Sequence, residues 1–264
     1  MPSTLSDLLR RLAAIALRAG DEIMTIYGSN VTAREKADLS PVTEADEAAE
    51  RLILGDLAES DPNIPIVSEE AASAGHIPKT AALFYLVDPL DGTKEFLTRN
   101  GEFTVNIGLI RDGCPVAGVV YAPAKGEIFA GEVGLGAWLA RIGGETKPST
   151  LEWTPIHTRA APPAEPVVVA SRSHMDAKTY AWLKAKGRHS LKSAGSSLKF
   201  CLLAKGEAVF YPRFGRTMEW DTAAGHAVLA AAGGSVATET GEPLTYGKVA
   251  AGYANPGFVA TARA

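Results

Sequence analysis

Apolar residues near the start of the chain recur at steps of three and four. One such series spans residues 5–26 and stops before Gly28, and a second spans residues 45–57. This spacing gathers apolar side chains on one helical face, so we predict two amphipathic helices. Thr43 followed by Asp46 has the spacing of a capping box, and an acid in a first turn is also favoured by the helix dipole.

The middle of the chain alternates apolar and polar positions in short runs separated by turn residues. This pattern predicts an antiparallel meander with strands at residues 84–87, 104–110, 116–121, 127–130 and 136–141. Ahead of it, residues 64–67 predict a short edge strand. We expect a loop after that strand, and this loop contains the adjacent acids Glu69 and Glu70.

The pattern changes after residues 143–166, which are rich in Gly, Pro, Thr and Ala and lack apolar periodicity. Beyond them, predicted strands at residues 167–170, 189–192 and 208–211 alternate with predicted helices at residues 176–186 and 198–204 and from Trp220 to Gly233. Alternation of this kind is typical of a layered α/β arrangement. We therefore predict an N-terminal α+β half, residues 1–150, and a C-terminal α/β half, residues 151–264.

The segment Asp88-Pro89-Leu90-Asp91-Gly92-Thr93 carries the most informative chemistry. It follows the apolar strand at residues 84–87, and we expect Pro89 to end ladder hydrogen bonding and begin a turn. Two carboxylates with the Leu90 carbonyl between them suit a hard cation such as Mg²⁺. Asp, Pro and Gly are also ordinary turn residues, so the segment taken alone is equally consistent with a simple turn.

Four acids in distant parts of the chain, at expected strand ends, loops and helix starts, could gather into one site: Glu69, Asp88, Asp91 and Asp221. Carboxylates that bridge two or three Mg²⁺ ions would activate a water and neutralise charge during phosphoryl transfer. Taken alone, Asp221 is predicted to be a helix N-cap, which is compatible with a ligand role.

Composition narrows the class of protein. The 264 residues are 46% hydrophobic and 21% charged, with a net charge of −4, which argues against a nucleic-acid scaffold but allows a local basic pocket. Cys114 and Cys201 are too few for a disulfide framework, which favours a reducing compartment. No signal-peptide pattern or run long enough to span a bilayer is visible. We expect a cytoplasmic protein, at most peripheral to the cytoplasmic face of the inner membrane.

Two segments together identify a family resemblance. Asp88 to Thr93, with Phe96 following, resembles the first signature of the inositol monophosphatase superfamily, and residues 220–225 (Trp-Asp-Thr-Ala-Ala-Gly) resemble the second. Glu69-Glu70 and residues 43–46 match in order and spacing. The continuation Lys94-Glu95-Phe96 is closer to the 3′(2′),5′-bisphosphate nucleotidases than to inositol monophosphatases. Three further segments resemble bacterial CysQ-type members of that group: residues 171–174, 195–200 and 211–216.

The resemblance implies a layered α-β-α-β-α sugar-phosphatase fold with its site between the halves. It implies two or three Mg²⁺ ions held by Glu69, Asp88, the Leu90 carbonyl, Asp91 and Asp221. Asp46 and Thr93 would orient and deprotonate the attacking water. The implied substrate contacts are Glu69, Asp91, Gly92, Thr93, Ser171, His174, Ser193, Gly195, Ser196, Lys199, Arg213 and Asp221.

The implied activity is hydrolysis of adenosine 3′,5′-bisphosphate to AMP and phosphate by a metal-activated water, without a phosphoenzyme. This reaction salvages the by-product of sulfate activation and sulfotransfer, and Li⁺ inhibition is expected. Arg172, Lys199, Arg213 and Arg216 are candidate anchors for the second phosphate. The substrate is a small nucleotide rather than a nucleic-acid polymer, and the protein is expected to be a monomer or homodimer.

Three alternatives stay open at this point. The same chemistry could act on an inositol monophosphate or on fructose 1,6-bisphosphate. A haloacid-dehalogenase-type phosphatase has a superficially similar acidic loop, but its acids are spaced differently and lie at the first strand. A catalytically silent metal- and nucleotide-binding sensor would be expected to lack one carboxylate or Thr93, and all are present.

Overall fold

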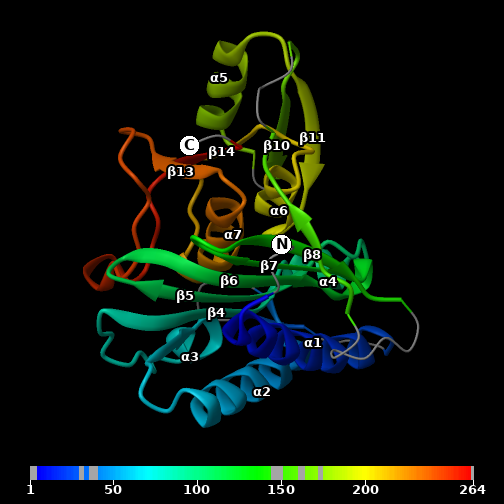
Figure 1. Cartoon of the computed structure of the whole chain (residues 1–264), viewed down its shortest axis with the longest axis vertical. Helices are drawn as coiled ribbons and strands as arrows, with labels where there is room; N and C mark the ends of the chain where they lie inside the picture. Colours follow the sequence, from blue (N-terminus) through cyan, green and yellow to red (C-terminus); the bar gives the residue numbers. More distant parts are fainter. Residues whose placement is uncertain are drawn as a thin grey trace.

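Five layers are stacked in the order helices, sheet, helices, sheet, helix (Figure 1). The computed structural model of the chain describes residues 5–29, 33–35, 41–143, 151–159, 164–171 and 175–262. The layered α-β-α-β-α fold expected from the sequence is confirmed. The helices that form the layers are α1 (Asp7–Tyr27), α2 (Glu44–Ser60), α5 (Ala177–Lys186), α6 (Leu198–Ala204) and α7 (Glu219–Ala231).

The larger sheet has seven strands in the order β3-β4-β5-β6-β7-β8-β9. β3 pairs with β4 in parallel, and the remaining neighbours are antiparallel, which confirms both the edge strand and the meander. The strands are β3 (Ile66–Ser68), β4 (Leu83–Asp91), β5 (Thr104–Arg111), β6 (Cys114–Ala122), β7 (Glu127–Glu132), β8 (Gly136–Arg141) and β9 (Thr154–Ile156).

The smaller sheet has five strands in the order β11-β10-β12-β14-β13. β10 lies parallel to both β11 and β12, whereas β14 is antiparallel to β12 and β13. The strands are β10 (Val167–Ser171), β11 (Ser190–Ala194), β12 (Phe210–Arg213), β13 (Ser235–Thr238) and β14 (Phe258–Thr261). Short connecting elements complete the described chain: β1 (Arg34–Glu35), β2 (Pro41–Val42), α3 (Glu69–Ser73), α4 (Thr93–Leu97) and 3-10 turns at Pro123–Lys125 and Val249–Ala251.

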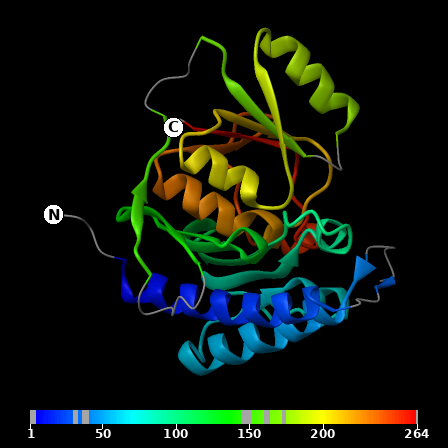
Figure 2. The ribbon, with the colours of Figure 1, turned by 90° about the vertical axis from the view of Figure 1, so that its right-hand side faces the viewer.

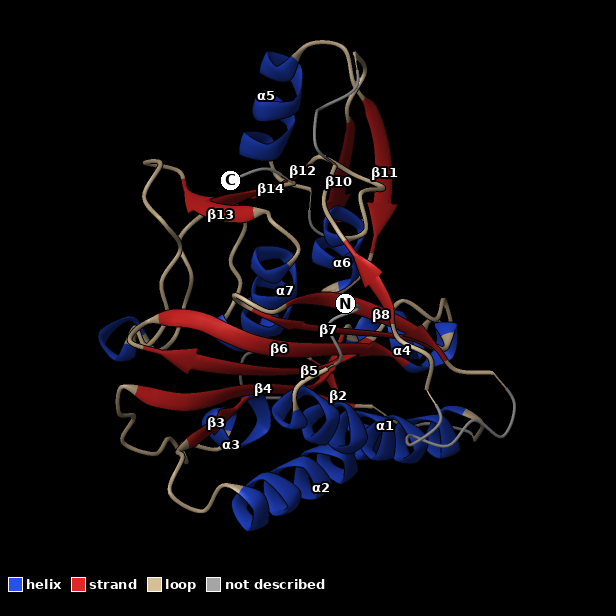
Figure 3. Ribbon diagram, in the orientation of Figure 1, coloured by secondary structure: helices blue, strands red, loops and turns tan. Residues whose placement is uncertain are grey.

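The two N-terminal helices lie side by side on the outer face of the larger sheet (Figure 2). The Ser6 hydroxyl accepts the Leu9 N–H at the start of α1. Thr43 and Asp46 form the predicted capping box at the start of α2. Figure 3 shows these helices on the face of the sheet away from α7, which leaves the inner face to α6 and α7.

Helix α7 approaches the larger sheet closely because a row of glycines crosses three neighbouring strands. Gly108, Gly118 and Gly131 are successive cross-strand partners on β5, β6 and β7. A Cβ at Gly118 would lie 2.6 Å from the Ala224 carbonyl oxygen of α7, a distance that real Cβ atoms do not show. The glycines therefore set how closely α7 packs against the larger sheet, including β4.

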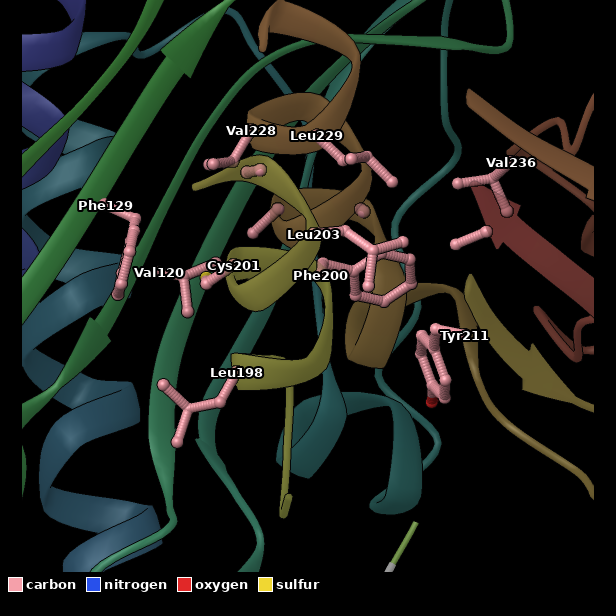
Figure 4. Close-up of a cluster of buried hydrophobic side chains, with 14 of the residues drawn as sticks. Val120, Phe129, Leu198, Phe200, Cys201, Leu203, Tyr211, Val228, Leu229 and Val236 are labelled. Carbon is pink, nitrogen blue, oxygen red and sulfur yellow. The ribbon is translucent and has the colours of Figure 1, made fainter. Parts of the chain in front are cut away.

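Apolar side chains from both sheets meet in one core between them (Figure 4). Phe200 of α6 packs edge-on against Tyr211 of β12, with ring centroids 5.2 Å apart. Phe129 of the larger sheet and Val228 of α7 belong to the same cluster. Burial of this shared core fixes the two halves relative to each other. Among the described residues, no helix is both long and apolar enough to cross a membrane.

Candidate active site

Asp88 and Asp91 both lie on strand β4. Asp88 pairs with Asn106 and Asp91 with Thr104, so three steps along β4 face two steps along β5. The expected turn at Pro89 is therefore wrong. The strand continues through a bulge, where a proline is tolerated because it interrupts the regular ladder anyway. The chain turns instead at Gly92, whose φ of 94° strains any residue with a side chain.

Three carboxylates converge in front of this bulge. Each of Glu69, Asp88 and Asp221 offers an oxygen within 4.8 Å of those of the other two. They come from α3, β4 and α7, and Asp91 lines the same pocket as Glu69 and Asp221. The expectation of a loop at Glu69 is wrong, because Glu69 is the first residue of α3. An acid at that position is favoured by the unpaired N–H groups of a first turn.

The expectation that Asp221 is an N-cap is also wrong. Met218 occupies the N-cap, and Asp221 is the third residue of α7. Asp221 Oδ2 accepts a hydrogen bond from the Met218 N–H at 2.8 Å, the reciprocal half of a capping box. The Ser197 hydroxyl donates to the Asp221 carbonyl at 2.7 Å. The start of α7 is thus anchored on both sides, which fixes the direction of the Asp221 carboxylate.

Burial and mutual repulsion perturb the acids of this cluster. Burial raises the pKa of Asp221 well above its ordinary value, and the charges of Asp91 and Glu69 raise it further. Burial also raises the pKa of Asp91 to about 6, with Lys199 opposing the rise and Glu69 and Glu95 adding to it. Such an arrangement is costly without a countercharge. Its all-oxygen donor set fits a hard divalent cation such as Mg²⁺, which would remove the repulsion.

Thr93 and Asp46 are brought into contact across 47 positions of sequence. The Thr93 hydroxyl donates to Asp46 Oδ1 at 3.2 Å. Asp46 Oδ2 accepts both the Thr43 N–H, at 2.8 Å, and the Thr43 hydroxyl, at 2.6 Å. Asp46 is 1% exposed, so its carboxylate is held rigidly beneath the Thr93 hydroxyl. This geometry suits a hydroxyl that accepts a proton from water and passes its own proton to a carboxylate.

Glu69, Asp91 and Asp221 line a cavity of about 250 Å³, and cationic side chains line the same cavity. Lys199, Arg213 and Arg216 line it together with Asp91 and Asp221. Burial lowers the pKa of Lys199 to about 8, the Asp91 charge opposes this fall, and the Arg213 charge adds to it. Lys94 lines it as well, so one cavity combines a carboxylate cluster with four cationic side chains.

Most of the predicted substrate contacts line this cavity: Glu69, Asp91, Gly92, Thr93, Ser171, Gly195, Ser196, Lys199, Arg213 and Asp221. Ser193 is exposed and lines a separate hollow of about 170 Å³ instead, together with Ala194. The Leu90 side chain is buried, and its carbonyl lies 3.5 Å from the Thr93 hydroxyl. His174 and Arg172 lie outside the described residues.

The Ser196 hydroxyl already has backbone partners. It lies 2.6 Å from the Glu102 carbonyl oxygen and 2.8 Å from that of Asp91, and these two acceptors share its single proton. A hydroxyl has one proton to donate, so a ligand would meet the Ser196 oxygen as an acceptor. Ser196 also adopts a φ of 49°, a left-handed conformation uncommon for a residue with a side chain.

The sequence analysis did not assign several polar residues of the site. Glu95 lines the cavity and is 7% exposed. Asn106 Nδ2 donates to Asp91 Oδ2 at 3.4 Å. The Lys199 ammonium lies over the Tyr211 ring, 5.3 Å from its centroid. A polar residue inside an otherwise apolar strand was the available signal for Asn106, whereas Tyr211 fits the apolar pattern of its strand.

A family model and curated relatives both match nearly the whole chain. The model of the inositol monophosphatase family matches residues 5–263. The 3′(2′),5′-bisphosphate nucleotidase CysQ of Escherichia coli K12 is 46% identical over 253 residues, which cover 95% of this chain and 98% of that protein. The protein of the same name from Buchnera aphidicola is 42% identical, over 97% of this chain and 94% of its own.

Solved structures of similar proteins have the same fold. The crystal structure of CysQ from Bacteroides thetaiotaomicron, described as a bacterial member of the inositol monophosphatase family, is 38% identical over 96% of both chains, with a TM-score of 0.78. An inositol monophosphatase from Anabaena is 25% identical over 97% of this chain and 90% of its own, with a TM-score of 0.74. These matches confirm the family resemblance, the fold that it implied and the expectation of a phosphatase. The chain belongs to the inositol monophosphatase family.

Proposed function

We propose that the protein is a Mg²⁺-dependent 3′(2′),5′-bisphosphate nucleotidase that converts adenosine 3′,5′-bisphosphate to AMP and phosphate. The observation that carries the proposal is the convergence of Glu69, Asp88 and Asp221 beside the Thr93–Asp46 contact. The names of the curated relatives at 42–46% identity support the same substrate class.

In this proposal the metal ligands are Glu69, Asp88, the Leu90 carbonyl, Asp91 and Asp221, and they hold two or three ions. Bound Mg²⁺ would lower the pKa of a water and neutralise charge on the phosphoryl group. The raised pKa values of Asp91 and Asp221 support the assignment, because these carboxylates lack sufficient countercharge from the protein alone.

Thr93 and Asp46 act as the proton acceptors of the proposed reaction. The attacking water gives a proton to Thr93 Oγ1 as the Thr93 hydroxyl proton moves to Asp46 Oδ1, 3.2 Å away. The water oxygen forms the new bond to phosphorus, the ester bond from phosphorus to the 3′-oxygen breaks, and the 3′-oxygen takes up a proton from the solvent to leave as the alcohol. No phosphoenzyme forms, so protein quenched during turnover of a radiolabelled substrate should carry no label.

The second phosphate of the substrate is assigned to the cationic side chains of the cavity. Lys199 and Arg213 are 6% and 9% exposed, and buried cations of this kind bind phosphate strongly. Arg216 lines the same cavity. A bisphosphate offers these cations a second phosphate to bind, which an inositol monophosphate lacks, so the cationic side of the cavity favours a bisphosphate.

The test is phosphate release from adenosine 3′,5′-bisphosphate and from inositol 1-phosphate, each with Mg²⁺ and with EDTA. Two charge-assisted contacts to the second phosphate predict a kcat/KM about a hundredfold higher for the bisphosphate. EDTA should abolish release, and Li⁺ should inhibit it. Faster hydrolysis of inositol 1-phosphate would instead support the second candidate, an inositol monophosphatase. Action in the cytoplasm and assembly as a monomer or homodimer stay predictions.

A further inference from the structure

Glu102 connects the two halves of the active site. It lies between α4 and β5, next to the segment that carries the acids. Its Oε2 accepts the Gly195 N–H at 2.9 Å, and its backbone carbonyl accepts the Ser196 hydroxyl at 2.6 Å. The Asp91 carbonyl oxygen, 2.8 Å from the same hydroxyl, shares its proton. We name this set of contacts among Glu102, Gly195, Ser196 and Asp91 the brace.

The chain segments that form the brace are packed in close contact. A Cβ at Gly195 would lie 2.7 Å from the Glu102 carbonyl oxygen, and a Cβ at Gly92 would lie 2.2 Å from Ser196 Oγ. Ser196 also adopts its left-handed conformation at this point, which persists only where surrounding contacts determine it. Two close backbone approaches and a strained residue thus coincide with the Glu102 hydrogen bonds.

The segment that Glu102 holds leads directly to the functional side chains. The Lys199 ammonium donates to the Ser196 carbonyl at 2.6 Å, and the Ser197 hydroxyl donates to the Asp221 carbonyl at 2.7 Å. A shift of residues 195–197 would therefore move the Lys199 ammonium relative to the acids of β4. Glu102 does not line the cavity with the acids, so it acts on a substrate through the brace and through its charge near Lys199.

We propose that Glu102 is a positioning residue that fixes the spacing between the carboxylate cluster and the Lys199 ammonium. Its carboxylate does this by accepting the Gly195 N–H. In the proposed function the cluster and Lys199 bind the two phosphates of the substrate, so Glu102 contributes to substrate affinity and leaves the chemical step unchanged. The expected effect on substrate affinity rests on the proposed function, whereas the positioning of residues 195–197 by Glu102 does not.

Two substitutions separate the hydrogen bond from the charge. Glu102→Ala removes the acceptor, whereas Glu102→Gln keeps an oxygen that can accept the Gly195 N–H. Glu127→Ala is the matched control, because the Glu127 side chain is 18% exposed, against 14% for Glu102, and its ion pairs are with Arg141 and Lys205. Lys125 lies 3.8 Å from Glu102 Oε1, and none of the three variants replaces it.

Kinetics give the first readout. Loss of a charge-assisted hydrogen bond predicts that Glu102→Ala raises the KM for adenosine 3′,5′-bisphosphate about tenfold, with kcat and the Mg²⁺ half-saturation point unchanged. Glu102→Gln should stay within about threefold of the parent protein, as should Glu127→Ala. Equal increases in the alanine and glutamine variants would overturn the positioning role, as would a fall in kcat without a change in KM.

Hydrogen–deuterium exchange in the ligand-free protein gives the second readout, which does not depend on activity. Exchange across residues 194–199 should accelerate in Glu102→Ala and stay unchanged in Glu102→Gln and Glu127→Ala. Unchanged exchange in Glu102→Ala would overturn the inference. If the parent protein failed to hydrolyse the bisphosphate, the proposed function would fail, and exchange would still decide whether the brace exists.

Glu102→Ala could fail to fold, and Ser196→Ala covers that case. It removes only the hydroxyl that joins the carbonyls of Asp91 and Glu102. It should accelerate exchange over the same residues and raise the KM. An exchange profile identical to that of the parent protein would overturn the role of the brace.

Discussion

Replacing Thr93 with valine removes one hydroxyl and leaves a side chain of nearly the same volume. That hydroxyl donates to Asp46 Oδ1 at 3.2 Å. Asp46 keeps its hydrogen bonds from the Thr43 N–H and hydroxyl, at 2.8 and 2.6 Å, so its carboxylate should not move. The substitution therefore isolates the proton-accepting role of the hydroxyl from the architecture around it.

The expected magnitude follows from the role of the hydroxyl. A positioned proton acceptor contributes about 10² to 10⁴ in rate, which corresponds to roughly 2.7–5.4 kcal/mol of activation free energy. We expect Thr93→Val to lower kcat by that factor, with KM and the Mg²⁺ half-saturation point within about threefold. Thr93→Ser, which keeps a hydroxyl at the same atom, should retain activity within about tenfold of the parent protein.

The assay is steady-state phosphate release from adenosine 3′,5′-bisphosphate at saturating Mg²⁺, with thermal unfolding as a check on folding. If kcat for Thr93→Val stayed within threefold of the parent value, the proton-transfer role would be wrong. If excess Mg²⁺ restored kcat, Thr93 would act mainly through metal affinity, and the account of the Thr93–Asp46 contact would also be wrong.

Two further predictions concern packing and pH. Gly118→Ala should destabilise the fold by about 1–3 kcal/mol, because its Cβ would lie 2.6 Å from the backbone of α7. Gly55→Ala, at an exposed position of α2, should stabilise the fold by about 0.5–1 kcal/mol. Denaturant unfolding measures both changes. Burial lowers the pKa of His226 to about 3, so the unfolded chain takes up a proton below about pH 6.5 that the native state excludes. This stability is present above that pH and is lost as pH falls, by about 2 kcal/mol between pH 7 and pH 5. The decline should be absent in His226→Gln, and an equal decline in both proteins would contradict the assignment.

Local sequence patterns were enough to predict the layers and the meeting of acids from distant motifs. The two N-terminal helices, the capping box at Thr43 and the antiparallel meander follow from periodicity and turn chemistry, and the structure confirms them. Four acids were predicted to gather: Glu69, Asp88, Asp91 and Asp221. Oxygens of Glu69, Asp88 and Asp221 lie within 4.8 Å of one another, and Asp91 lines the same pocket as Glu69 and Asp221. These predictions succeeded because each depends on residues that are close in sequence or that belong to long, specific motifs.

The errors involve details that only the folded chain decides. The sequence predicts a turn at Pro89, but β5 supplies strand partners for β4 on both sides of the bulge and keeps β4 extended. The sequence predicts Asp221 as the N-cap of its helix, but the N-cap of α7 is Met218, three residues earlier. Glu102 could not be found, since its link to Gly195 spans 93 positions and leaves no periodic pattern in the sequence.

The central claim is that Glu69, Asp88, Asp91 and Asp221 form one site for divalent cations. Thermal unfolding of the parent protein and of Asp221→Asn, in EDTA and in Mg²⁺, tests it most directly. In EDTA the variant should be the more stable protein, because burial and the neighbouring carboxylates raise the pKa of Asp221 and penalise its charged form. Mg²⁺ should stabilise the parent protein and reverse this order. Equal Mg²⁺ stabilisation of the two proteins, or none of the parent protein, would contradict the claim.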